Sequence, residues 1–215
     1  ESADRVYLAQ TGLVGGDFPN HKTPLALVPG DRTLKDGQNE LVVRFESPDV
    51  GGVKLVKTYT FERGSYAVRV QHDVQNTGTA AVAPQLYMQL VRDGNPPPGE
   101  SSFYSTFTGP AIYSEAKKYQ TVGFKSIENN KVDVEKTATN GYVAMVQHYF
   151  ASAWLLADGL KRDLFTRKVD NNLYAVGMIT PLDSIAPGAT QSVQSKLFVG
   201  PQEEKVLESL APGLE

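Results

Sequence analysis

The residues best suited to proton transfer or metal binding are the histidines, which number three and occupy positions 21, 72 and 148. A neutral imidazole binds metals and exchanges a proton near neutral pH, so each is a candidate. His72 and His148 fall in stretches with strand patterns, whereas His21 lies in a loop rich in glycine and proline. His72 allows two interpretations: a residue held by hydrogen bonds at the edge of the core, or a ligand-binding residue at a cleft. We keep His72 and His148 as candidate cleft residues.

Other residue types do not form a catalytic pattern. The chain has no cysteine, which excludes disulfides, thiolate metal ligands and cysteine nucleophiles. It also contains no GxSxG, HExxH or Walker motif. Neighbouring carboxylates, such as Glu203 with Glu204 or Asp163 near Asp170, are interpreted as charges of a helix start and of a hairpin. The sequence therefore predicts no catalytic residue, no cofactor and no metal site.

Composition favours an ordinary globular domain. Of the 215 residues, 40% are hydrophobic and 21% are charged, which is typical of neither a disordered chain nor a membrane bundle. The net charge of −3 argues against a nucleic-acid surface, because no basic excess is present to neutralise phosphates. No linker rich in proline, serine and glycine divides the chain, so we predict one domain over residues 1–215. The sequence begins at Glu1 rather than at methionine, and we expect it to be part of a longer protein.

The most apolar run, NGYVAMVQHYFASAWLL at residues 140–156, holds the only tryptophan and is predicted to form the centre of the core. If the run is extended, both of its faces are largely apolar, which is typical of a strand buried on both sides. Periodicity alone does not separate such a strand from a buried helix. The turn residues Asn140, Gly141, Asp158 and Gly159 on either side of the run favour strands.

Shorter apolar stretches alternate with turn signals along the rest of the chain. About twelve short strands at a spacing of roughly 8–12 residues indicate a large antiparallel β-sandwich of two sheets. Gly109 and Pro110 are interpreted as a corner followed by a polar helical turn, and the charged residues 161–168 as a hairpin. The clearest of the predicted strands cover residues 6–9, 39–45, 53–61, 66–74, 81–91, 102–107, 173–180 and 191–199.

A short helix is predicted at the end of the chain, over residues 201–211. Pro201 suits the first helical position, and Glu203 lies near the positive end of the helix dipole. Val206, Leu207 and Leu210 form one apolar edge. About ten residues are too few for a helix to be stable alone in water, so this edge must dock on the sandwich or on a partner.

Three separated stretches resemble one protein family. Residues 140–154 resemble its segment Gly-aromatic-Val-Ala-Met-x-Gln-x-Tyr-Phe, with Tyr142 where tryptophan is commoner. Residues 102–119 resemble its Thr-Phe-x-Gly-x-Ala-x-Tyr…Lys-Tyr segment, and residues 197–215 its passage toward a second transmembrane helix. The family is the large periplasmic domain of the bacterial membrane protein insertase YidC.

The resemblance implies a supersandwich like that of galactose mutarotase, on the periplasmic face of the inner membrane of a Gram-negative bacterium. It implies a non-catalytic role in interaction and support within a multi-pass insertase and chaperone. That insertase places membrane protein substrates alone or with the Sec translocon, whose SecD and SecF subunits are the expected partners. No nucleic acid or metal is expected to bind. Residues of the terminal helix would couple the sandwich to the membrane part: Glu203, Val206, Leu207 and Leu210.

The implied fold also leaves an alternative from another functional class, a carbohydrate-binding or aldose-epimerase-like sandwich. Epimerase chemistry of this kind requires a general acid and a general base, commonly His and Glu, that face one another across a cleft. The chain offers His72 and His148 on strands but no evident carboxylate partner for either. Fold analogy alone does not determine function.

Overall fold

The structure is a computed structural model that describes residues 4–100, 103, 106–203, 205, 207 and 209–211. Strands make up most of the regular secondary structure in this part of the chain, which also contains the short helix α1 (Phe124–Glu128). The strands are β1 (Tyr7–Val14), β2 (Ala26–Leu27), β3 (Glu40–Glu46), β4 (Val53–Glu62), β5 (Ala67–Asn76), β6 (Gln85–Asp93), β7 (Gly109–Ser114), β8 (Lys118–Thr121), β9 (Thr137–Ala138), β10 (Tyr142–Val146), β11 (Phe150–Leu156), β12 (Arg162–Asp170), β13 (Leu173–Pro181) and β14 (Thr190–Pro201).

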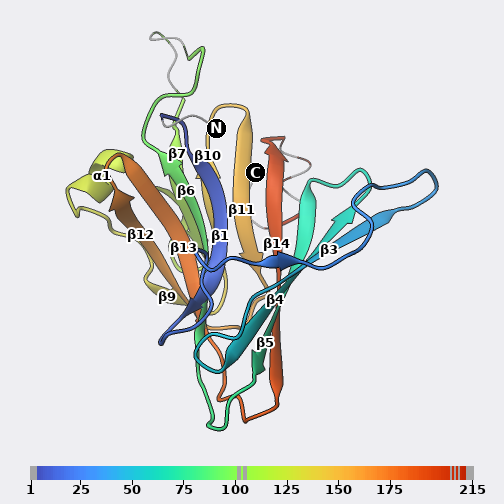
Figure 1. Cartoon of the computed structure of the whole chain (residues 1–215). Coiled ribbons are helices and arrows are strands. Elements are labelled where there is room, and N and C mark those ends of the chain that lie inside the picture. Colours follow the sequence, from blue (N-terminus) through green and yellow to red (C-terminus); the bar gives the residue numbers. More distant parts are fainter. Residues whose placement is uncertain are drawn as a thin grey trace. The chain divides into compact units, whose positions relative to one another are not determined.

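The strands form two antiparallel sheets (Figure 1). The five-stranded sheet has the order β1-β6-β13-β12-β9, and the nine-stranded sheet has the order β2-β3-β4-β5-β14-β11-β10-β7-β8. The predicted all-β architecture of two sheets is confirmed.

The chain divides into two compact units. The first unit comprises Glu1–Gln10, Met88–Met178 and Phe198–Glu215, and the second comprises Thr11–Tyr87 and Ile179–Leu197. Each boundary between them falls inside a strand, namely β1, β6, β13 or β14. A single domain over residues 1–215 stays a prediction.

The hairpin of β4 and β5 shows how the sequence pattern builds the second unit. Val70, His72 and Val74 are buried on one face of β5, as their alternation with polar residues predicts. Lys57 lies directly opposite His72 in the register of the two strands. The hairpin therefore places two ionisable side chains within the core.

The apolar run at residues 140–156 differs from the prediction in one respect. It forms two strands, β10 and β11, in place of one continuous strand. The chain reverses at residues 147–149, where the N–H of Gln147 donates to the carbonyl of Phe150 at 3.0 Å and His148 and Tyr149 are exposed. The polar Gln-His pair interrupts the apolar run, so the turn forms at these residues.

The predicted corner at Gly109 and Pro110 is wrong, because both residues belong to β7, which lies between β10 and β8. Pro110 has no N–H to donate, but its carbonyl accepts from the N–H of Val122 at 2.8 Å. Of the strand predicted over residues 102–107, positions 102, 104 and 105 lie outside the described residues, and Thr106 and Phe107 have no regular secondary structure.

Candidate functional site: the seat of the C-terminal segment

Three alanines lie side by side on one face of the nine-stranded sheet. Ala144 of β10 pairs in register with Ala111 of β7 and with Ala153 of β11, and all three side chains are completely buried. Alternate residues of a strand point to the same face, so their small side chains form a shallow floor across three neighbouring strands. We call these three residues the alanine row.

Leu207 packs in the same cluster as the alanine row. Its side chain is 1% exposed. The N–H of Leu207 donates to the carbonyl of Glu203 at 3.0 Å, and the N–H of Ala211 donates to the carbonyl of Leu207 at 3.3 Å, which are bonds of helical spacing. The buried members of the cluster are Ala111, Tyr142, Ala144, Val146, Ala151, Ala153, Leu155, Phe198 and Leu207.

Aromatic side chains border this seat at one end. The rings of Tyr113 and Tyr142 stack with centroids 5.3 Å apart and planes 10° apart. Leu210 and Ala211 pack against the cluster, and both line a cavity of about 240 Å³ that the two tyrosines also border. Gly141 enters β10 with a φ of +91°, and a Cβ at this position would lie 2.0 Å from the carbonyl oxygen of Tyr113. Only glycine fits this turn.

The opposite face of β10 and β11 is buried against the five-stranded sheet. The indole N–H of Trp154 donates to the carbonyl of Gln89 in β6 at 3.1 Å. The hydroxyl of Tyr7 in β1 donates to the carbonyl of Met145 at 3.1 Å and forms a hydrogen bond with Ser152 at 2.6 Å. Both faces of these strands are covered, which explains why the run is apolar at odd and even positions alike.

Three of the four predicted coupling residues lie in the described part of the chain. Leu207 is buried in the seat, Leu210 is half-buried beside it, and the side chain of Glu203 is exposed. Val206 lies outside the described residues. Pro201 is the last residue of β14 and does not begin the helix; Lys205 and Leu207 are helical. The alanine row was not predicted from the sequence, although the small residues at positions 111, 144 and 153 within apolar stretches were a signal for it.

His72 is completely buried in the second unit. Its Nε2 forms a hydrogen bond with the hydroxyl of Thr11 at 2.8 Å, and the ammonium of Lys57 donates to the carbonyl of Thr11 at the same distance. Burial, with a contribution from the Lys57 charge, lowers the pKa of His72 to about 3. Burial lowers the pKa of Lys57 to about 8. We call Thr11, Lys57 and His72 the buried polar triad.

The remaining histidines lie at the surface. Nδ1 of His148 forms a hydrogen bond with the hydroxyl of Thr106 at 2.8 Å, and its ring meets that of Tyr149 edge-on with centroids 3.9 Å apart. His21 contacts the hydroxyl of Tyr87 through its backbone N–H at 2.8 Å and through Nδ1 at 2.5 Å. The structure thus gives each histidine a different hydroxyl partner.

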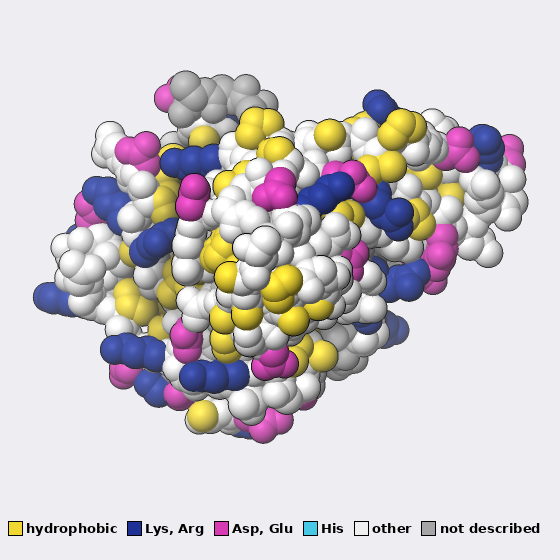
Figure 2. All heavy atoms as spheres, turned by 60° about the horizontal axis from the view of Figure 1, so that its bottom comes forward, with side chains coloured by type: hydrophobic (Ala, Val, Ile, Leu, Met, Phe, Trp, Pro, Cys, Tyr) yellow, Lys and Arg dark blue, Asp and Glu magenta, His cyan; other side chains and the backbone are white. Residues whose placement is uncertain are grey.

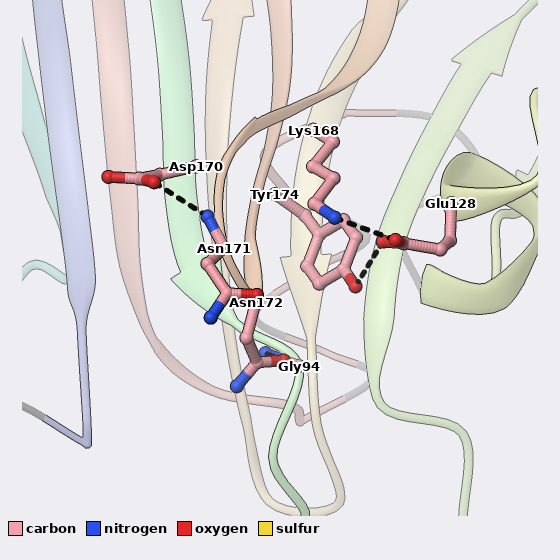
Figure 3. Close-up of polar contacts among 7 residues, drawn as sticks. All are labelled: Gly94, Glu128, Lys168, Asp170, Asn171, Asn172 and Tyr174. Atoms are coloured by element: carbon pink, nitrogen blue, oxygen red, sulfur yellow. Dashed lines mark hydrogen bonds and ion pairs between the residues drawn. The ribbon is translucent and has the colours of Figure 1, made fainter.

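An exposed polar cluster joins α1 to β12 and β13 (Figure 3). One carboxylate oxygen of Glu128 accepts from Lys168 at 2.6 Å, and the other accepts from the hydroxyl of Tyr174 at 2.9 Å. The hydrogen bond from Lys168, followed by that from Tyr174, lowers the pKa of Glu128. Both charged side chains are about two-fifths exposed, and their contact connects α1 to β12 at the surface.

The distribution of surface charges and of possible metal ligands suggests no further candidate site among the described residues. On the face that Figure 2 draws, Lys and Arg side chains are interspersed with Asp and Glu side chains. Among the described residues, no three His, Asp or Glu side chains are grouped closely enough to hold a metal ion. The helical segments that the structure describes are too short to span a bilayer.

One known protein family matches the whole chain. The model of the YidC periplasmic domain family matches residues 1–215. A membrane protein insertase YidC from Burkholderia cenocepacia is 53% identical over 215 residues, which are 100% of this chain and 39% of the relative. One from Janthinobacterium sp. is 53% identical over 212 residues, or 98% of this chain and 37% of the relative. The chain therefore spans about two-fifths of the length of the relatives it matches.

Comparison with solved structures supports the fold. A galactose mutarotase related enzyme from Lactobacillus acidophilus superimposes with a TM-score of 0.50 at 6% identity, over 83% of this chain and 72% of that one. The predicted mutarotase-like sandwich is confirmed. At this identity the likeness shows the fold and nothing of the chemistry.

Proposed function

This chain belongs to the family of YidC periplasmic domains, and we propose that it is a non-catalytic module that supports a membrane protein insertase through its C-terminal segment. In the parent protein, this segment would couple the sandwich to the membrane part on the periplasmic side of the inner membrane. The whole insertase would place membrane proteins in the bilayer, alone or with the Sec translocon, and would assist their folding.

The observation that carries this proposal is the burial of Leu207 over the alanine row. Leu207 is 1% exposed, and the burial of its apolar side chain stabilises the attachment of this short segment to the sheet. The backbone hydrogen bonds within so short a segment would contribute less. A force or displacement at the segment would therefore reach β7, β10 and β11 directly. A segment attached in this way is suited to mechanical coupling.

The coupling proposal is tested in the full-length parent protein, expressed in a strain depleted of its own insertase. We expect Leu207→Ser and Leu210→Ser to impair insertion of a substrate protein, because each places a hydroxyl in or beside an apolar seat. Lys205→Ser is the matched control, since Lys205 lies in the same segment and is exposed.

Two further measurements separate coupling from simple loss of protein. Immunoblots report the amount of each variant, and thermal unfolding of the 215-residue chain reports its stability. Impaired insertion at a normal protein level supports coupling. Full insertion by Leu207→Ser at a normal level would refute it.

SecD and SecF are the partners that we propose for the sandwich surface. A photo-crosslinking amino acid introduced at Val42, Val169 or Val199 would sample three exposed strand positions, on β3, β12 and β14. Covalent products with SecD or SecF from at least one position are expected. If no exposed strand position gives such a product, the partner assignment is wrong.

The carbohydrate alternative depends on the fold alone. His72 is completely buried and bonded to Thr11, and His148 is bonded to Thr106, so neither has a carboxylate among its hydrogen-bond partners in the described structure. Titration with galactose, glucose and short oligosaccharides is expected to give no saturable binding. Saturable binding with NMR shifts near either histidine would favour the alternative.

A further inference from the structure

A separate pocket lies in the first unit where β1 begins and β6 ends. Its volume is about 310 Å³, which is at the small end of the range for small-molecule sites. Arg5, Tyr7, Arg92 and Gln147 line it together with the three successive prolines at positions 96–98. We call it the proline pocket.

Arg92 is the principal polar group of the proline pocket. The residue is 5% exposed. Its guanidinium donates to the carbonyl of Asp93 at 2.9 Å through Nε, to Oε1 of Gln147 at 2.9 Å through Nη1, and to the carbonyl of Asn95 at 3.0 Å through Nη2. Because each terminal nitrogen carries two N–H groups, one N–H on each has no partner among the described residues.

The guanidinium carbon of Arg92 lies 5.8 Å from the ring centroid of Tyr7 and 5.9 Å from that of Phe124, which compensates its positive charge in part. The guanidinium forms no salt bridge with a carboxylate in the described part of the chain. The carboxylate of the adjacent Asp93 already accepts from the backbone N–H groups of Val6 and Asn95, each at 2.9 Å. Burial lowers the pKa of the guanidinium, and the charges of Asp93, Tyr7 and Glu100 oppose that shift. A buried guanidinium is costly unless its N–H groups are hydrogen-bonded or an anion meets it, and two N–H groups of Arg92 lack a partner among the described residues.

We propose that the proline pocket binds a carboxylate group attached to an apolar body. The two uncommitted N–H groups of Arg92 donate to the carboxylate, as guanidinium groups do in bidentate pairs. Arg5 adds a second positive charge at the rim. The proline rings and the ring of Tyr7 contact the apolar body. A free organic acid and the C-terminus of a hydrophobic peptide both offer this chemistry, and the inference is independent of the insertase role.

Titration of the isotopically labelled chain, followed by NMR, tests the chemistry of the ligand. Phenylacetate is compared with its neutral isostere phenylacetamide, and the tripeptide Ala-Ala-Phe with its C-terminal amide. We expect saturable shifts at Arg5, Asn95 and Gln147 with the acids and none with the amides. Saturation by phenylacetate alone identifies a small-acid site, and tighter saturation by the tripeptide identifies a peptide C-terminus.

Substitutions test which residues bind the carboxylate. Arg92→Gln is expected to weaken binding about tenfold or more, since hydrogen bonds to a charged group are lost. Arg5→Gln, at the pocket rim, is expected to weaken it about threefold. Arg32→Gln is the matched control, because Arg32 is an exposed arginine outside the pocket, and it should leave binding unchanged.

Several results would overturn the proposal. Equal binding of an acid and its amide would show that the carboxylate is not recognised. If neither acid gives saturable shifts, the site does not exist. If Arg92→Gln does not fold, the comparison of Arg5→Gln with Arg32→Gln decides. Equal affinity of those two variants would show that Arg5 does not contribute to binding and would overturn the proposed pair of arginines.

Discussion

The seat of Leu207 in one compact unit and the buried polar triad in the other are both in the protein interior, yet their contributions to stability differ in kind. In the seat, Leu207 and the alanine row belong to one apolar cluster, and their side chains need no hydrogen-bond partner. The triad holds an ammonium and an imidazole, and Nδ1 of His72 has no hydrogen-bond partner among the described residues. Apolar packing stabilises at every pH, whereas the triad links the free energy of unfolding to protonation.

The largest expected difference is the response to acid. The pKa of His72 is about 3 in the folded chain against an ordinary value of 6.5, so between these values the unfolded chain binds more protons than the folded one. Stability therefore falls as the pH falls through this window. The loss attributable to His72 is on the order of 5 kcal/mol at the acid end.

Urea unfolding of the wild type and His72→Gln at several pH values measures this loss. Glutamine keeps a hydrogen-bonding group near Thr11 but does not titrate, so the variant should lack the His72 share of the pH dependence. Leu207→Ala serves as the control, because its difference from the wild type should be constant over the same range. Parallel curves for wild type and His72→Gln would contradict the buried neutral imidazole.

Truncation of the apolar seat should have the next largest effect. Leu207→Ala leaves a void over the alanine row and is expected to lower the free energy of unfolding by about 3 kcal/mol. Val199→Ala is the matched control, since Val199 is 56% exposed, and its effect should stay below about 0.5 kcal/mol. Chemical denaturation of both variants makes the comparison. Equal losses would mean that the C-terminal segment does not depend on the seat.

Removal of the buried ammonium should act in the opposite direction. Burial lowers the pKa of Lys57 from 10.5 to about 8, so at pH 7 the folded chain bears the full cost of a desolvated charge. Lys57→Met removes that cost but leaves the carbonyl of Thr11 without its donor. We expect a net gain of about 2 kcal/mol at pH 7.

The pH dependence of the Lys57→Met variant checks the sign of this effect. Between pH 8 and 10.5 the unfolded wild type binds more protons than the folded one, so wild-type stability rises with pH in this window. The advantage of Lys57→Met should shrink over the same range. A variant that is less stable at pH 7, or an advantage that grows with pH, would show that the ammonium is well solvated in the folded chain.

The same contrast explains what could be predicted from sequence. The alternation of Val70, His72 and Val74 with polar residues indicated the inward face of β5, since strand periodicity depends on local spacing alone. The triad could not be foreseen in this way. Thr11 lies 61 positions from His72, so their contact depends on the pairing of distant strands.

The seat of Leu207 was also predicted only in part from the sequence. The apolar edge that includes Leu207 predicted a docked helix, and the apolar run of β10 predicted burial on both faces. The sequence does not predict its partner surface, because Gly109 and Pro110, which directly precede Ala111, are typical of a corner followed by a polar turn. Pro110 nevertheless lies within β7: it has no N–H to donate, but its carbonyl still accepts a hydrogen bond from Val122.

The smallest effect is expected at the exposed pair of Lys168 and Glu128, which completes the comparison between interior and surface. Lys168→Met removes the 2.6 Å contact but leaves the bond between Glu128 and Tyr174. Solvent screens the two charges, and ordering two exposed side chains offsets much of their attraction. The change in melting temperature should therefore be much smaller than that of Leu207→Ala and should vanish at high salt. A loss as large as that of Leu207→Ala would mean that the attachment of α1 to β12 stabilises the first unit as strongly as its apolar core does.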